Sequence, residues 1–165
     1  MADTELTTLL GVLNGKRRHV LEILAGLDEE ALRRPVLPSG WTCLGLVHHL
    51  SLDVEEFWFR AVAAGERAAI EEILGSGADA WHPDPALTAE QVFARYRQET
   101  ARADAFLATA DPDAPLAWWP DFFDDWRYHT LREVALHVIT ETATHAGHLD
   151  AVRELLDGRQ HLVLD

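Results

Sequence analysis

Hydrophobic residues recur every three to four positions along four stretches of this chain, near residues 4–25, 42–64, 88–109 and 130–157. This spacing places them on one face of an α-helix, because a helix turns by about 100° per residue. No stretch has the strict alternation that is typical of a β-strand. Four long helices with long connections predict an all-α protein, a four-helix bundle forming a single domain over residues 1–165.

The last two of these helices have clear start signals. Thr88 with Gln91, and Thr130 with Glu133, have the spacing of a capping box. Gly158 is expected to end the last helix, because glycine readily adopts the left-handed backbone found there. Turn-forming residues break the chain after the first helix and again after the second, at Pro35, Pro38, Gly40, Gly65, Gly75, Gly77, Pro83 and Pro85. The second connection is long, as a crossover would be.

Polar residues that can bind a metal ion interrupt the hydrophobic face of the last helix. That face comprises Leu131, Val134, Val138, Thr142, His145, Leu149, Val152 and Leu156. Glu141 and His148 lie beside His145 within about 60° on a helical wheel. Because residues four apart are neighbours, Glu141 and His145 can offer an oxygen and a nitrogen to one ion. The alternative is two hydrogen-bonded core histidines and a Glu141 that reaches solvent.

The second helix offers a further ligand in the pair His48-His49. His48 points nearly opposite the hydrophobic face and is expected to be a solvated surface residue, whereas His49 lies at the edge of that face. His49 is therefore the candidate ligand. Asp53, one turn on, could orient the His49 ring or serve as another ligand, although an exposed His–Asp pair without a metal is an equal alternative.

Two motifs in this chain resemble those of a known family. The first is Leu32-Arg33-Arg34-Pro35-Val36-Leu37-Pro38-Ser39-Gly40 followed by Leu44-Gly45-Leu46-Val47-His48-His49-Leu50. The second runs from His137 through Glu141, His145, Gly147, His148 and Asp150 to Arg153-Glu154. In this order they resemble the DinB-like superfamily of four-helix proteins, most closely its DUF664 branch, which is related to mycothiol-dependent metalloenzymes.

The resemblance implies a metal triad of His49, Glu141 and His145, the same three residues that the helical pattern favours. Many relatives carry His at the position of Glu141 and Gln at that of His148. His148 is therefore a candidate catalytic residue with three roles open: a fourth ligand, a proton carrier or a substrate contact.

The composition of the chain restricts the kinds of partner that it is expected to bind and the cell compartment in which it is expected. With 14 basic and 28 acidic residues, the formal charge is −14, which repels nucleic acid and anionic membrane surfaces. No secretory signal or membrane span is visible, so a cytoplasmic protein is expected. Cys43 is the one cysteine, which excludes an intrachain disulfide. Its place on the hydrophobic face near a helix start favours a buried structural thiol over a nucleophile.

The segment 116–128 before the last helix contains six aromatic residues, Trp118, Trp119, Phe122, Phe123, Trp126 and Tyr128. These rings are expected mainly to cap the end of the bundle as plain core, the alternative being the wall of a substrate pocket above the metal. Arg127, Arg132 and Arg153 could bind a substrate carboxylate, although isolated arginines are more often surface charges.

Three protein ligands with an open position are typical of catalytic zinc, which either acidifies water or stabilises a thiolate. The resemblance favours the thiolate, so we predict a metal-dependent S-transferase, or thiol-assisted isomerase, that uses a low-molecular-weight thiol such as mycothiol and an unidentified electrophile. Zinc is the expected metal, with nickel, iron or manganese as alternatives. The rival functions are a metal-dependent hydrolase and a non-catalytic metal-binding or small-molecule-binding bundle. Pairing of related proteins favours a homodimer.

Overall fold

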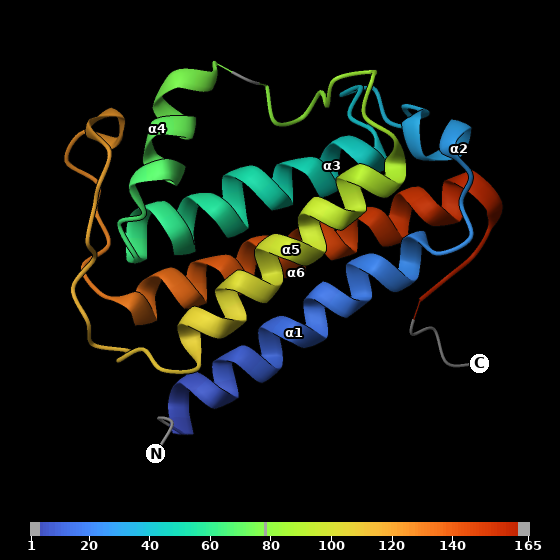
Figure 1. Ribbon diagram of the computed structural model, residues 1–165. Helices are drawn as coiled ribbons and strands as arrows, with labels where there is room; N and C mark the ends of the chain where they lie inside the picture. Colours follow the sequence, from blue (N-terminus) through green and yellow to red (C-terminus); the bar gives the residue numbers. More distant parts are fainter. Residues whose placement is uncertain (1–3, 78, 162–165) are drawn as a thin grey trace.

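The computed structural model describes residues 4–77 and 79–161 and consists mainly of helices (Figure 1). The helices are α1 (Thr4–Leu24), α2 (Glu29–Arg33), α3 (Cys43–His49), η1 (Leu50–Ala63), α4 (Arg67–Ser76), α5 (Ala89–Leu107), η2 (Asp121–Phe123) and α6 (Leu131–Asp157). Within the described residues the one β-type pairing is an isolated bridge between Pro115 and Thr130. The predicted all-α fold is therefore confirmed.

Four long helical units form the bundle: α1, the continuous pair α3–η1, α5 and α6. Figure 1 shows α1 and α6 running side by side in one direction, while α3–η1 and α5 run in the other. The long connection through α4 therefore returns the chain to the end where α3 begins, so that α5 can run parallel to α3–η1. This is the crossover that the spacing of glycines and prolines predicts. No helix in the described part of the chain combines the length and hydrophobicity that crossing a membrane requires.

The predicted helix ends are confirmed. Thr88 and Thr130 each accept a hydrogen bond from the backbone of the third helical residue, and Gln91 and Glu133 complete the two capping boxes. Gly158 ends α6 with a φ of 77°, and its backbone N–H donates to the carbonyl of Glu154. These ends fix the start and the register of α6, on which the candidate ligands lie.

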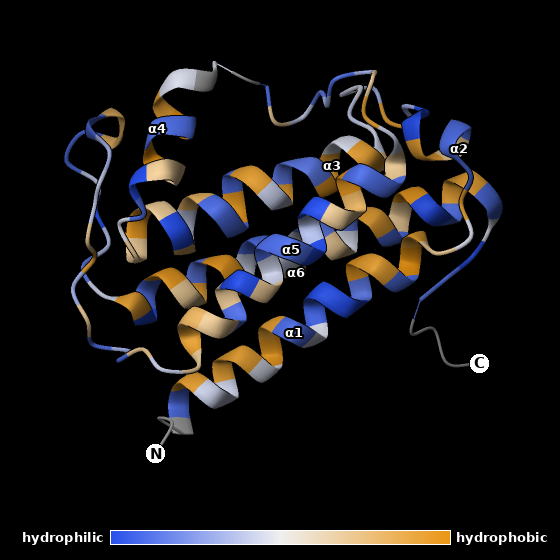
Figure 2. Ribbon diagram, viewed as in Figure 1, coloured by the Kyte–Doolittle hydropathy of each residue, from blue (hydrophilic) through white to orange (hydrophobic). Residues whose placement is uncertain are grey.

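The α3–η1 unit is buried nearly all round, which the single hydrophobic face in its sequence does not predict. η1 is a π-helix, wider than an α-helix because its hydrogen bonds span five residues. Glu55 and Glu56 on this helix are 1% and 2% exposed and form ion pairs with Arg17 and Arg95. Figure 2 shows hydrophobic and hydrophilic residues alternating along the long helices, as their amphipathic sequences require.

Two short helices lie in segments that the sequence pattern treats as connections. α2 begins at Glu29 and is capped by Asp28, whose side chain accepts a hydrogen bond from the Ala31 backbone, and α4 follows Glu66. The sequence analysis did not predict these two helices, because helices this short contain too few turns to establish a hydrophobic period.

Candidate functional site

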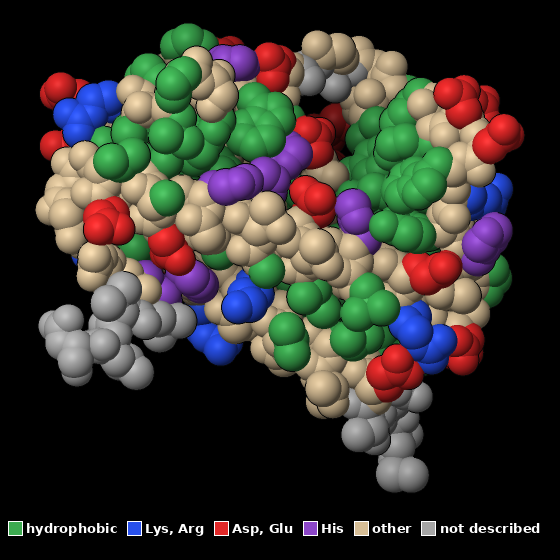
Figure 3. Space-filling model, turned by 180° about the vertical axis from the view of Figure 1, so that it is seen from behind, with side chains coloured by type: hydrophobic (Ala, Val, Ile, Leu, Met, Phe, Trp, Pro, Cys, Tyr) green, Lys and Arg blue, Asp and Glu red, His purple; other side chains and the backbone are tan. Residues whose placement is uncertain are grey.

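The structure brings His49, Glu141 and His145 together between two helical units. His49 is the last residue of α3, and the other two lie one turn apart on α6. One possible ligand atom from each residue lies within 4.8 Å of the other two. Figure 3 shows histidine and acidic side chains gathered between two hydrophobic areas on this face of the molecule. The geometry is therefore that of three donors around one point near the surface.

The ring of His49 is held from two sides. Its Nδ1 lies 2.8 Å from Oδ2 of Asp53, and Trp81 stacks on its face at a centroid distance of 4.1 Å. Because Nδ1 is engaged by the carboxylate, Nε2 is the nitrogen available to a metal. Asp53 thus lies where a carboxylate that orients a ligating histidine is expected, and the side chain of His49 is only 13% exposed.

Trp81 reaches His49 because its backbone packs directly on α3. A Cβ built on Gly45 would lie 2.2 Å from the carbonyl oxygen of Trp81, so glycine is required for this close approach. His48 fixes the same segment, since its Nδ1 donates a hydrogen bond of 2.7 Å to the carbonyl of Ala80. The prediction that His48 is a solvated surface residue was therefore wrong. A helical wheel considers only the residues of one helix, so it could not show that the long connection covers this side of α3.

His145 is the most buried of the three candidate ligands, at 9% exposure. Its Nε2 lies 3.4 Å from Oε2 of Glu141, and its Nδ1 lies 3.4 Å from Nδ1 of His148. Burial, together with the neighbouring imidazole of His49, lowers the pKa of His145 to about 4, although Glu141 opposes the shift. His145 is therefore neutral at physiological pH, the form in which imidazole binds metals.

This depressed pKa gives a testable pH dependence. In the metal-free protein, the His145 ring should stay neutral as the pH falls from 7 to 5 and titrate near pH 4. The unfolded chain takes up this proton near the ordinary pKa of 6.5. The stability that the neutral ring contributes is thus present above pH 6.5 and is lost as the pH falls through about 4. NMR titration of the His145 Hε1 signal measures this directly, and a midpoint above pH 6 would contradict it.

His148 lies beside the three candidate ligands and is exposed to solvent. Its ring contacts Trp41 at 6.2 Å and His145 at 5.4 Å, as centroid distances. Among the described residues, the group of side chains that can hold one ion comprises His49, Glu141 and His145 and does not include His148. The position of His148 therefore favours an indirect role, in which it contacts the candidate ligand His145, over a role as a fourth metal ligand.

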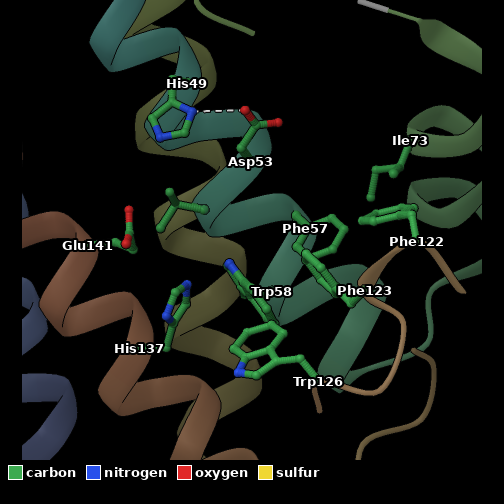
Figure 4. A pocket seen from close by; sticks show the side chains of 11 residues that line it. His49, Asp53, Phe57, Trp58, Ile73, Phe122, Phe123, Trp126, His137 and Glu141 are labelled. Atoms are coloured by element: carbon green, nitrogen blue, oxygen red, sulfur yellow. Dashed lines mark hydrogen bonds and ion pairs between the residues drawn. The ribbon is translucent and has the colours of Figure 1, made fainter. Parts of the chain in front are cut away.

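A pocket of about 410 Å³ opens beside the candidate ligands (Figure 4). His49, Asp53, His137 and Glu141 lie at its polar end. The other walls are hydrophobic: Val54, Phe57, Trp58, Ile73, Phe122, Phe123 and Trp126. Three of these rings, Phe122, Phe123 and Trp126, come from the aromatic segment 116–128. The expectation that this segment serves mainly as core capping holds for Trp118, Trp119, Phe123 and Tyr128, which pack against the core, and was wrong for Phe122 and Trp126.

The arginines considered for substrate binding are engaged elsewhere. Arg132 pairs with Glu5 and Asp113, and Arg153 donates to the carbonyls of Ile23 and Ala25. Arg127 lies over the ring of Trp119, and none of the three arginines lines the pocket. The structure therefore gives no support to the alternative that they bind a substrate carboxylate in this pocket.

Cys43 is fully buried, as predicted. Burial raises the pKa of its thiol to about 11, although Arg153 opposes the shift. A thiol with this pKa is protonated at neutral pH and is a poor nucleophile. Cys43 therefore acts as a core residue, and any reactive sulfur at this site must come from a bound molecule.

Comparison with known families gives one relationship. The model of the Mycothiol-S-transferase family matches residues 8–158, which include all three candidate ligands and the bundle helices except the first turn of α1. No curated protein matches the sequence of this chain. The match covers most of the chain and agrees with the DinB-like resemblance, although it does not test the DUF664 branch. The chain belongs to the mycothiol-S-transferase family.

Proposed function

We propose that this chain is a metal-dependent thiol S-transferase in which His49, Glu141 and His145 hold a divalent ion, most simply zinc. The observation that carries the proposal is the convergence of these three donors within 4.8 Å beside a hydrophobic pocket. Membership of the mycothiol-S-transferase family favours mycothiol, a low-molecular-weight thiol, as the sulfur donor.

The donor set suits a divalent ion on chemical grounds. Asp53 engages Nδ1 of His49 and leaves Nε2 free, while burial keeps His145 neutral. Two imidazoles and one carboxylate are a catalytic zinc ligand set, and nickel, iron or manganese can use the same donors. His145 thus needs no proton loss at neutral pH before an ion binds.

A bound ion of this kind would supply Lewis acidity that favours the deprotonated form of a thiol at neutral pH. The surrounding residues have supporting roles. Asp53 holds the His49 ring, and we assign His148 as the acceptor of the Nδ1 proton of His145, which directs Nε2 of His145 toward Glu141. The aromatic walls of the pocket offer ring contacts to the electrophile.

Product analysis tests this proposal. Purified protein loaded with zinc should convert mycothiol and an electrophile to the S-conjugate, detected by mass spectrometry, at a rate above the uncatalysed reaction. The His145→Ala variant should lose the catalysed rate, while His129→Ala, at an exposed site before α6, should retain it. Turnover that proceeds without thiol and incorporates water into the product would instead establish a hydrolase.

A further inference from the structure

The pocket beside the candidate ligands has a chemical character that restricts its ligand. Seven of its lining residues are hydrophobic, and none of its lining residues is lysine or arginine. The charged groups that line it are the carboxylates of Asp53 and Glu141. Without a metal ion, a negatively charged ligand would therefore lose its hydration without gaining a cation, whereas an uncharged aromatic ligand would gain ring contacts. In the loaded enzyme the charge of the proposed ion would be taken up by the thiolate.

His137 is a polar group of this pocket to which the proposed metal site gives no role. It lies one turn before Glu141 on α6 and is half-buried. Its Nδ1 is 3.1 Å from the hydroxyl oxygen of Tyr128, and Trp58 lies against its ring at a centroid distance of 4.6 Å. Figure 4 shows the His137 ring directed into the space between Glu141 and Trp58.

The contact with Tyr128 fixes which nitrogen of His137 can face a ligand. Burial lowers the pKa of His137, so the ring is neutral at pH 7 and carries one N–H. Burial also raises the pKa of Tyr128, so the phenol keeps its proton and can donate it to Nδ1. The proton of His137 then lies on Nε2, away from Tyr128, as a hydrogen-bond donor at the polar end of the pocket.

We propose that this pocket binds an uncharged, mainly hydrophobic electrophile, such as an aryl enone, whose carbonyl oxygen accepts a hydrogen bond from Nε2–H of His137. This assignment rests on the proposed S-transferase activity and makes His137 a catalytic residue of it. Tyr128 is then a positioning residue that holds the required tautomer.

The reaction with an enone balances as an addition. The thiolate sulfur uses a lone pair to form the S–C bond at the β-carbon, and the π electrons of the C=C bond shift toward the carbonyl oxygen. Nε2–H of His137 stabilises the negative charge that develops on this oxygen. The α-carbon then takes one proton from solvent, which balances the one proton that the thiol lost. No oxidant or leaving group is needed.

Binding to the metal-free protein tests the assignment without relying on turnover. Three unreactive ligands of nearly the same shape serve as probes: benzylacetone, which has the carbonyl; butylbenzene, which lacks it; and hydrocinnamate, which carries a carboxylate. Calorimetry should show that benzylacetone binds most tightly, butylbenzene less tightly and hydrocinnamate most weakly. The dissociation constant of hydrocinnamate should be at least about 10-fold higher than that of benzylacetone.

Variants of His137 then test the hydrogen bond itself. His137→Phe should reduce the preference for benzylacetone over butylbenzene by about 3- to 10-fold, the value of one neutral hydrogen bond. His137→Gln keeps a hydrogen-bond donor and should restore part of the preference for benzylacetone. The control variant Leu136→Ala, on the exposed side of α6, should leave this preference unchanged. With the loaded enzyme, His137→Phe should lower kcat for benzylideneacetone by about 100-fold.

Two results would overturn the assignment. One is hydrocinnamate binding as tightly as benzylacetone in the unmodified protein, a comparison that needs no variant. The other is an unchanged ketone preference in a His137→Phe protein whose circular dichroism is native. Neither result depends on thiol transfer, so failure here is distinguishable from failure of the proposed function.

Discussion

Replacing His49, Glu141 or His145 by Ala is expected to weaken metal binding by more than about 100-fold in each case and to abolish S-conjugate formation. The basis is that loss of a group that merely orients a ligand already costs about 10- to 100-fold in metal affinity. Asp53→Ala should show that smaller loss, because the carboxylate acts through Nδ1 of His49. Competition with a chromophoric chelator measures all four affinities.

His129→Ala is the matched control for these variants, since its side chain is exposed and lies outside the group of candidate ligands. The helical circular dichroism of all variants should be preserved, because the hydrophobic core rather than an ion holds the bundle together. Stoichiometric metal retained in all three triad variants would show that the metal lies elsewhere.

Arg17→Met is expected to lower the free energy of unfolding by about 3–5 kcal/mol, the cost of leaving a buried charge without its partner. Arg17 makes two hydrogen bonds to Glu55, of 2.7 and 2.5 Å, and both residues are almost fully buried. Denaturant unfolding followed by circular dichroism gives the change in free energy.

Removing both charges separates the cost of an unpaired group from the value of the pair. The double variant Arg17→Met/Glu55→Leu should recover much of the lost stability, because hydrophobic residues often replace a buried ion pair at little cost. Arg67→Met breaks an exposed ion pair with Glu71 and should change stability by less than about 1 kcal/mol. An equally small effect of Arg17→Met would refute a structural role for the buried pair.

The helices and candidate ligands follow from local sequence to a large extent. The spacing of Glu141 and His145 places them one turn apart on any α-helix, and the capping box at Thr130 fixes where that helix begins. The position of His49 at the edge of its hydrophobic face was also sufficient to choose it over His48. The structure places these three side chains close together, while their role as metal ligands stays a prediction.

Features that depend on contacts between distant segments could not be predicted in this way. Trp81 lies in a long connection without periodicity, yet it stacks on His49. Glu55 is buried because Arg17 from another helix pairs with it, and the amphipathic pattern gives no sign of this. Phe122 and Trp126 line the pocket for the same kind of reason, since their place depends on how their segment folds back over η1.

The central claim, that the metal site holds a thiol for transfer, is tested most directly by cobalt substitution. Cobalt(II) bound by His49, Glu141 and His145 should develop a sulfur-to-metal charge-transfer band when mycothiol is added, saturating at one thiol per site with release of one proton. The same band should be absent in His145→Ala and with an alcohol in place of the thiol. Cobalt that binds at the triad but gives no such band at any thiol concentration would contradict this account.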